Sequence, residues 1–433
     1  MPNGIISVLI IPTMSIKSLS DTQINKYIED NLAIREKERD NYAEVFTSPK
    51  LINELLDNLP TNSWTNPDLT WLDPCAGKGF FGVLIYQRLL SGLSKKIPDL
   101  KKRKEHILDN MLFMIEINKD NGKSLYKLFG GSTKISVSDF IEEPDKWERD
   151  LGRKQFDIVI GNPPFQTPKE ETYTGSAGNR TLWNQFVEGI FEKSIIAIKG
   201  HLAFITPSGW RRPEHPIFDR LTKDNRLLYL HIYSKSDGQQ LLGAQTRFDL
   251  YVVQEGIHLR QKTRIIDEKG KTHTINVNKW PFIPNFAFSK IKNILVSKDK
   301  GIKIIFSAGD FGGRVKLTKN KTKKHRHPIV HTITQKGLGI RYSKKTHAHK
   351  PKVLLNFNER QYPYNDYKGE YGMSQLTFGI PIKSKKEGDD WIRTINSEKF
   401  QEIIKATKWN TFQTDYRMFK WFDPKLYTNR LVV

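Results

Sequence analysis

Cysteine and long apolar runs are nearly absent from this sequence. Cys75 is the single cysteine among 433 residues, which excludes a disulfide framework and a zinc site built on several cysteines. The first apolar run, residues 5–11, follows no basic segment and is too short to be a signal sequence or to cross a bilayer. We therefore expect a cytoplasmic protein with no membrane segment.

Acidic residues are few relative to basic ones. Asp and Glu number 47 against 70 Lys and Arg, which gives a formal net charge of +23. An excess this large indicates a polyanionic partner rather than a requirement of the fold. Nucleic acid is the first candidate, and an acidic membrane surface is the second.

The chain is long enough for two or three domains. From residue 41 to 255, short apolar runs alternate with stretches of helical period, which is typical of βαβ units around a parallel sheet. The predicted strands are residues 69–73, 111–117, 134–137, 156–160, 201–206 and 227–233, and the predicted helices include 50–58, 80–90 and 182–197.

The pattern changes after residue 255. Short strand-like pieces with Gly, Pro and Asn turns lead to a predicted helix over 397–407, so residues 256–433 form a separate domain. Residues 1–40 are an appendage with a charged helix near 24–39. Residues 301–360 carry 15 Lys and Arg against Asp310 and Glu359, so more than half of the excess positive charge lies in this segment.

Two short motifs follow predicted strands. Asp73-Pro74-Cys75-Ala76-Gly77-Lys78-Gly79 lies between a strand and a helix; its glycines permit positive φ and close approach of a ligand, although such a turn also simply closes a βα corner. The spacing does not fit a P-loop. Asn162-Pro163-Pro164-Phe165 follows a buried strand, and its two prolines make it a rigid shelf at the strand's carboxyl end, with an Asx turn as the alternative.

These motifs resemble those of the N6-adenine DNA methyltransferases whose cofactor motifs precede the target-recognition region. The resemblance covers residues 42–254 and includes 44–49, which is similar to the family's Phe-Thr-Pro segment with Ser48 inserted before the proline. It implies a Rossmann-like, doubly wound α/β catalytic domain over 41–255 that uses S-adenosylmethionine. A smaller mixed α+β target-recognition domain over 256–433 would then bind double-stranded DNA.

The resemblance also implies roles for single residues. Glu116 would hold the cofactor's ribose hydroxyls and Asp139 its adenine amino group, although each acid alone could be a solvated strand end. The implied cofactor-binding residues are Thr47, Asp73, Pro74, Gly77, Gly79, Glu116, Asp139 and Phe140. The implied catalytic residues are Asn162, Pro163, Pro164 and Phe165.

The chemistry of an aromatic amine explains the catalytic motif. Its lone pair is delocalised into the ring, so it attacks a sulfonium methyl group poorly unless acceptors hold its two N–H groups and favour a pyramidal nitrogen. Asn162 offers a side-chain carbonyl and Pro163 a backbone carbonyl, so positioning and electrostatics carry the rate. Phe165 would stack on the base after it has been flipped out of the duplex.

The basic segment predicts phosphate contacts, with a solvated charged face as the alternative. The predicted contacts are Arg314, Lys316, Lys323, Lys324 and Arg326, while bases would be read elsewhere, for example by residues 356–367. Histidine pairs at 325 and 327 and at 347 and 349 lack nearby cysteines and carboxylates, so we predict no metal site.

Other functions stay open at this point. Methylation at cytosine C5 is disfavoured, because it needs a cysteine after the fourth strand and Cys75 follows the first. Methylation of RNA bases or of a protein glutamine, and a DNA-binding modification subunit, remain alternatives. The sequence does not decide whether the protein forms a homodimer or has a partner restriction enzyme.

Overall fold

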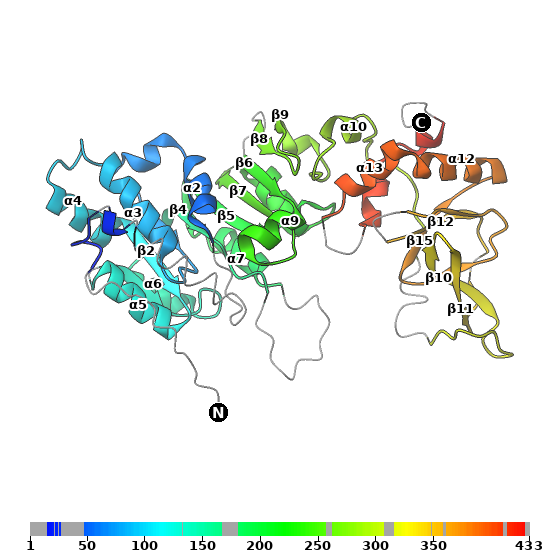
Figure 1. Ribbon diagram of the computed structural model, residues 1–433, viewed down its shortest axis with the longest axis horizontal. Coiled ribbons are helices and arrows are strands. Elements are labelled where there is room, and N and C mark those ends of the chain that lie inside the picture. The colour runs from blue at the N-terminus through cyan, green and yellow to red at the C-terminus, as the bar shows by residue number, and fades with distance from the viewer. Residues whose placement is uncertain are drawn as a thin grey trace. The chain divides into compact units, whose positions relative to one another are not determined.

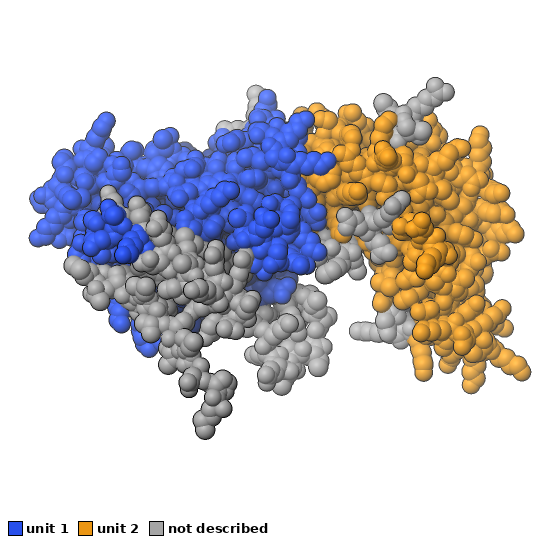
Figure 2. Space-filling view, in the orientation of Figure 1, with its two compact units in different colours: residues 1–208, 219–278 blue, residues 209–218, 279–433 orange. Residues whose placement is uncertain are grey.

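The chain folds into two units. The computed structural model describes residues 15–20, 22–24, 26, 47–131, 133–166, 181–256, 262–306, 316–347, 349–357, 361–409 and 414–428. The first unit comprises residues 1–208 and 219–278, and the second comprises residues 209–218 and 279–433 (Figure 2).

A nine-stranded mixed sheet forms the centre of the first unit. Its strands are β1 (Trp71–Asp73), β2 (Leu112–Glu116), β3 (Lys134–Val137), β4 (Phe156–Gly161), β5 (Ile196–Pro207), β6 (Arg226–Tyr233), β7 (Phe248–Gln254), β8 (Thr263–Ile266) and β9 (Thr272–Ile275). They lie in the order β3-β2-β1-β4-β5-β7-β6-β8-β9.

The pairing of these strands creates a switch point between β1 and β4. From β3 to β5 all neighbours are parallel, whereas β7 is antiparallel to both β5 and β6. The chain first builds β2 and β3 on one side of β1 and then returns to place β4 on the other. In open α/β sheets, ligands bind outside the carboxyl ends of the strands at such a point.

Helices cover both faces of the parallel part of the sheet (Figure 1). They are α2 (Pro49–Asp57), α3 (Phe80–Gly92), α4 (Leu100–His106), α5 (Lys119–Phe129), α6 (Pro144–Leu151) and α7 (Trp183–Glu192). Every residue of β1 and β2 is buried as a result, which explains why these strands read as continuous apolar runs. The first unit also contains α9 (Lys235–Asp237), whereas most of α8 (Pro216–Asp219) belongs to the second unit.

The second unit contains two three-stranded sheets and several helices (Figure 1). One sheet joins β10 (His327–Thr334), β11 (Gly337–Ser343) and β14 (Gly372–Met373), and the other joins β12 (Lys352–Asn356), β13 (Tyr364–Asp366) and β15 (Thr377–Pro381). Its helices are α10 (Phe288–Lys292), α12 (Lys385–Asn396) and α13 (Glu398–Ala406). The predicted fold class, a doubly wound α/β domain followed by a smaller mixed domain, is confirmed.

Several boundaries differ from those that the sequence predicts. The helix predicted over 182–197 ends at Glu192, because Ser194 adopts a φ of 53° and reverses the chain into β5. The first unit extends to Asn278 rather than to residue 255, because β8 and β9 continue the large sheet. The charged helix predicted near 24–39 lies almost entirely outside the described residues.

None of the helices in the described segments has the length and apolar character needed to cross a membrane.

Candidate active site

The ends of β1 and β4 approach each other closely. Asp73 closes β1, and its Oδ1 accepts a hydrogen bond from the Cys75 amide at 3.1 Å. Gly161 closes β4, and a Cβ atom at this position would lie 3.1 Å from Asp73 Oδ1 and 3.2 Å from Cys75 Sγ. The lack of a side chain at Gly161 therefore lets the segment Asn162–Phe165 start directly beside the loop after β1.

The loop after β1 depends on two glycines in left-handed conformations. Gly77 has a φ of 55° and Gly79 a φ of 84°. A Cβ atom on Gly79 would lie 2.7 Å from Leu125 Cδ2 and 2.8 Å from Phe129 Cε2, whereas one on Gly77 would meet nothing within 4 Å. Gly79 thus allows α3 to pack against α5, and Gly77 leaves one side of the loop open to a ligand.

Glu116, at the end of β2, holds this loop in place. Its Oε2 accepts a hydrogen bond from the Gly77 amide at 2.6 Å, and its Oε1 accepts one from the Asn118 amide at 2.8 Å. The side chain is buried, with 6% of the residue exposed. The Glu116 carboxylate therefore binds the backbone of the loop at Gly77, a contact that the sequence did not reveal.

Asp73 carries an unusual carboxyl group. Its pKa is raised to about 7, mainly by burial and in part by the negative charge of Glu116, while hydrogen bonding with Cys75 partly opposes the shift. Its Oδ2 is buried and has no hydrogen-bond partner among the described residues. Positive charge from a ligand would be stabilised at this carboxyl group.

Thr47 holds the side-chain amide of Asn162. The amide Nδ2 of Asn162 donates a hydrogen bond to Thr47 Oγ1 at 2.9 Å. The amide Oδ1 is buried and has no hydrogen-bond partner among the described residues. The structure thus brings Thr47 to the Asn-Pro-Pro-Phe motif, although 115 residues separate Thr47 and Asn162 in sequence.

The residues after Asn162 have different environments. Pro163 is buried and Pro164 is exposed. Phe165 is half-buried and packs against the hydrophobic core of the first unit. Part of the Phe165 side chain is therefore accessible, as a stacking surface requires.

Asp139 and Phe140 follow β3 and both serve the local fold. Asp139 Oδ1 accepts hydrogen bonds from the amides of Ile141 at 2.7 Å and Glu142 at 3.0 Å. The Phe140 ring is stacked with Trp147 and Phe186, at centroid distances of 5.8 and 5.1 Å. Only 4% of Phe140 is exposed, so its ring is part of the core.

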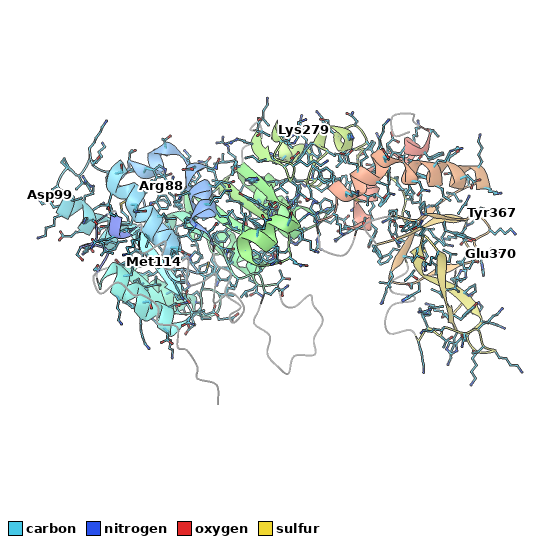
Figure 3. All side chains as sticks on the ribbon, viewed as in Figure 1. Arg88, Asp99, Met114, Lys279, Tyr367 and Glu370 are labelled. Carbon is cyan, nitrogen blue, oxygen red and sulfur yellow. The ribbon has the colours of Figure 1, made fainter. Side chains whose placement is uncertain are left out.

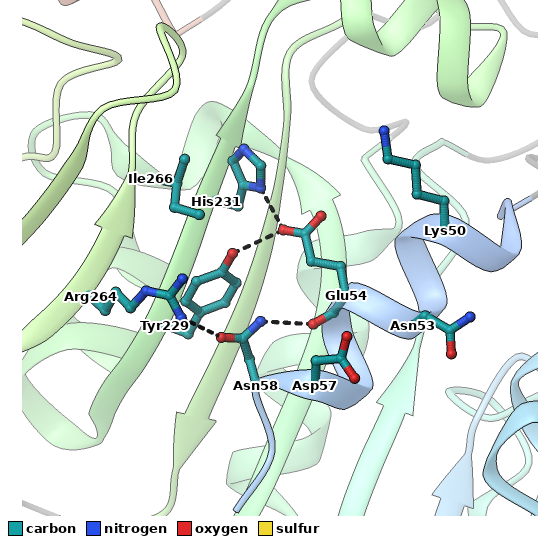
Figure 4. Close-up of a pocket in the computed structure, with 9 residues that line it drawn as sticks. All are labelled: Lys50, Asn53, Glu54, Asp57, Asn58, Tyr229, His231, Arg264 and Ile266. Atoms are coloured by element: carbon teal, nitrogen blue, oxygen red, sulfur yellow. Dashed lines mark hydrogen bonds and ion pairs between the residues drawn. The ribbon is translucent and has the colours of Figure 1, made fainter. Parts of the chain in front are cut away.

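A separate cavity of about 600 Å³ lies between α2, β6 and β8 (Figure 4). Glu54 of α2 accepts hydrogen bonds there from Tyr229 at 2.9 Å, from His231 at 2.5 Å and from Tyr233. Burial raises the pKa of Glu54, but these donors outweigh burial and lower it below its usual value. This cluster was not predicted from the sequence. The signal that could have revealed it is a hydrogen-bonding side chain at every second position of β6, at Tyr229, His231 and Tyr233.

The basic segment lies in the second unit. Residues 316–347 contain ten Lys and Arg and no acidic residue. Four of the five predicted phosphate contacts are exposed, namely Lys316, Lys323, Lys324 and Arg326, whereas Arg314 lies outside the described residues. The segment contains the antiparallel strands β10 and β11 of the sheet that β14 completes.

The described residues of the segment predicted to read bases, 356–367, include both buried and exposed side chains. Asn356 is 2% exposed and donates from Nδ2 to the Ile333 carbonyl at 2.6 Å, and Gln361 is 1% exposed. Tyr367 is 40% exposed (Figure 3), with the ammonium groups of Lys368 and Lys385 5.8 and 5.6 Å from its ring centroid. Tyr364 is also exposed, at 36%.

The histidine pairs do not form a metal site in the part of the chain that the structure describes. No group of three or more His, Cys, Asp or Glu residues is arranged to hold a metal ion there. The rings of His347 and His349 lie 4.5 Å apart, and His349 Nδ1 lies 3.1 Å from the Gly369 carbonyl.

Comparisons with known proteins show which family this chain resembles. Residues 83–238 match the family model described as the Eco57I restriction-modification methylase. The chain is also 29% identical over 270 residues to an adenine-specific methylase of Mycoplasma pneumoniae. These matches support the N6-adenine methyltransferase family. The methyltransferase match includes Glu116, Asp139 and residues 162–165, and the predicted resemblance is confirmed.

The relatives differ from this chain in extent. The alignment with the Mycoplasma methylase covers 45% of this chain and 62% of the length of that protein. The structure of DrdV in a complex with DNA superposes with a TM-score of 0.52 at 9% identity, and the match covers 94% of this chain and 59% of that chain. The second similarity concerns the fold alone.

Proposed function

We propose that this protein transfers a methyl group from S-adenosylmethionine to N6 of adenine in double-stranded DNA, as part of a restriction-modification system. The observation that carries the proposal is the buried Oδ1 of Asn162, which has no hydrogen-bond partner among the described residues and lies at the carboxyl end of β4, beside the glycine loop of β1. The adenine-specific methylase that matches this chain supports the choice of substrate.

The geometry suits an exocyclic amine. Asn162 Oδ1 would accept from one N–H of the amine, and the Pro163 carbonyl from the other. Two acceptors favour a pyramidal nitrogen whose lone pair is available to attack, and neither has to ionise. The adenine would be flipped out of the duplex into a pocket formed by residues 162–165, with its ring on Phe165.

The residues near the loop fit a cationic cofactor. S-adenosylmethionine supplies the methyl group from a sulfonium centre. Asp73, whose buried Oδ2 has no hydrogen-bond partner among the described residues, would stabilise the cofactor's positive charge, while Gly77 would let the cofactor approach the backbone. We assign Glu116 to the ribose hydroxyls and Asp139 to the adenine amino group, with Thr47, Pro74, Gly79 and Phe140 shaping the site.

Replacement of Asn162 tests the proposal. Asn162→Ala should lose methyl transfer by about 10²-fold or more, because a positioned polar contact is removed, while the fold and the affinity for S-adenosylmethionine are kept. The assay measures incorporation of labelled methyl groups into duplex DNA, with circular dichroism and calorimetry as controls. Wild-type turnover in the variant would exclude this mechanism.

The same labelled cofactor distinguishes the alternative substrates. Wild-type protein should label adenine in duplex DNA and leave ribosomal RNA and protein release factors unlabelled. Sequencing of DNA from cells that express the protein identifies the modified base and its sequence context together. Labelling of RNA or protein alone would overturn the proposed substrate, and binding of DNA without any transfer would indicate a modification subunit.

A further inference from the structure

We propose that Thr47 is a positioning residue that fixes the amide plane of Asn162, so that Oδ1 remains as the acceptor for the substrate amine. This inference rests on the proposed function and assigns Thr47 a task other than binding the cofactor. The hydrogen bond from Asn162 Nδ2 to Thr47 Oγ1 is 2.9 Å long. Thr47 is buried, with 7% of the residue exposed.

The start of α2 explains why the Thr47 hydroxyl is available. Thr47 and Ser48 both precede Pro49, and only one of them can cap the helix. Ser48 is the N-cap, with its Oγ accepting from the Leu51 amide at 3.5 Å and Pro49 at the first helical position. The Thr47 hydroxyl therefore does not serve the helix and is directed to Asn162.

The helix that follows Thr47 is itself anchored. Glu54 lies near the middle of α2 and accepts hydrogen bonds from three side chains of β6, those of Tyr229, His231 and Tyr233. Buried leucines and an isoleucine on the opposite face of α2 join the core of the first unit. The helix start, and with it Thr47, is thus held to the sheet independently of Asn162.

The hydrogen bond matters because an asparagine amide rotates freely when nothing holds it. Rotation about the Cβ–Cγ bond would turn Oδ1 away from the substrate or present the NH₂ group, and a donor facing the N–H of the amine would repel it. A bond at Nδ2 fixes the amide plane at the end that the substrate does not use. The opposite end, Oδ1, is buried, accepts no hydrogen bond from the described residues, and is therefore available to the substrate amine.

Substitutions at Thr47 test the inference. Thr47→Val keeps the shape and removes the hydroxyl; kcat should fall roughly 10-fold, the worth of one hydrogen bond, while Kd for S-adenosylmethionine and KM for DNA stay within twofold. Thr47→Ser should restore most of kcat. In the Asn162→Ala background, Thr47→Val should have no further effect, because the two residues act as one unit.

The controls separate this role from others. Ser48→Ala removes the helix cap and should lower stability without changing kcat; an equal fall in kcat would attribute the effect to the helix start and overturn the inference. Weaker cofactor binding with unchanged kcat in Thr47→Val would make Thr47 a cofactor contact instead. If the wild type is active but the effects of Thr47→Val and Asn162→Ala on kcat are additive, the inference about Thr47 is wrong and the proposed function stands. If the wild type leaves DNA unmethylated, the proposed function is wrong and the inference falls with it.

Discussion

Asp73 is a carboxylic acid buried among groups that do not neutralise it. Its pKa of about 7 lies above the ordinary value of 3.8, mainly because of burial. The folded protein therefore binds this proton more tightly than the unfolded chain. The resulting stability is fully present below pH 4 and is lost as the pH rises through about 7.

This linkage predicts a pH dependence that one substitution removes. Between pH 4 and 8, the free energy of unfolding of the protein without cofactor should fall by up to roughly 4 kcal/mol more in the wild type than in Asp73→Asn. Chemical denaturation at each pH measures the difference. The exposed Asp68→Asn is the matched control and should follow the wild type. Parallel curves for Asp73→Asn and wild type would mean that Asp73 ionises normally in the fold.

The residues of the candidate site differ in how visible they are in the sequence. Asn162, Asp73 and Glu116 could be placed at strand ends, because each directly follows an apolar run. The partners of these residues could not. Thr47 is brought to Asn162, and Gly77 to Glu116, by contacts between segments that are far apart in the sequence, and a motif carries no information on such pairs.

Helices and strands could be predicted where the apolar residues of a segment follow one period, that of a helix or that of a strand. β3 has the bounds that the sequence predicts, and α3 begins at Phe80 as predicted. The helix predicted over 182–197 was too long, because the apolar residues 195–197 suit a buried strand as well as a helix. The residues of β8 and β9 were predicted to belong to the second domain, but both strands continue the large sheet of the first unit. Nothing in the local sequence distinguishes an added edge strand from the start of a new domain.

The loop between β1 and α3 yields a prediction for two glycines. Gly79→Ala should lower the free energy of unfolding by about 2–5 kcal/mol, because a left-handed alanine costs about 1–2 kcal/mol and its Cβ forces Leu125 and Phe129 apart. Gly77→Ala has the same conformational cost and open space around Cβ, so about 1–2 kcal/mol is expected. Urea denaturation measures both. Equal losses would show that α5 yields to the added methyl group.

Charge is distributed unevenly over the whole molecule. The described residues 316–347 carry ten cationic side chains without one acid, and they include the antiparallel ribbon of β10 and β11, which the short strand β14 extends. A ribbon of this kind fits the major groove of a duplex, and flexible cations beside it suit phosphates. The exposed tyrosines Tyr364 and Tyr367 are better candidates for base contacts than the buried Asn356.

Neutralising the basic segment should therefore weaken DNA binding without changing sequence choice. The variant replaces four exposed cations with glutamine, namely Lys316, Lys323, Lys324 and Arg326. Affinity should fall about equally for cognate and unrelated duplexes, because phosphates carry no sequence identity. The slope of log K against log salt should flatten by about 0.9 for each phosphate that the variant no longer neutralises, at most about 3.6 for all four.

A matched variant separates local contacts from net charge. It neutralises four exposed lysines of the first unit, Lys101 and Lys102 of α4 and Lys119 and Lys127 of α5. Both variants lose four charges, so an effect of net charge alone would change both slopes alike, whereas direct contacts flatten the slope only for the basic segment. Fluorescence anisotropy titrations over a range of salt concentrations measure the slopes. An unchanged slope in the first variant would make the segment a solvated face, and a weakening confined to the cognate site would make it an element that reads bases.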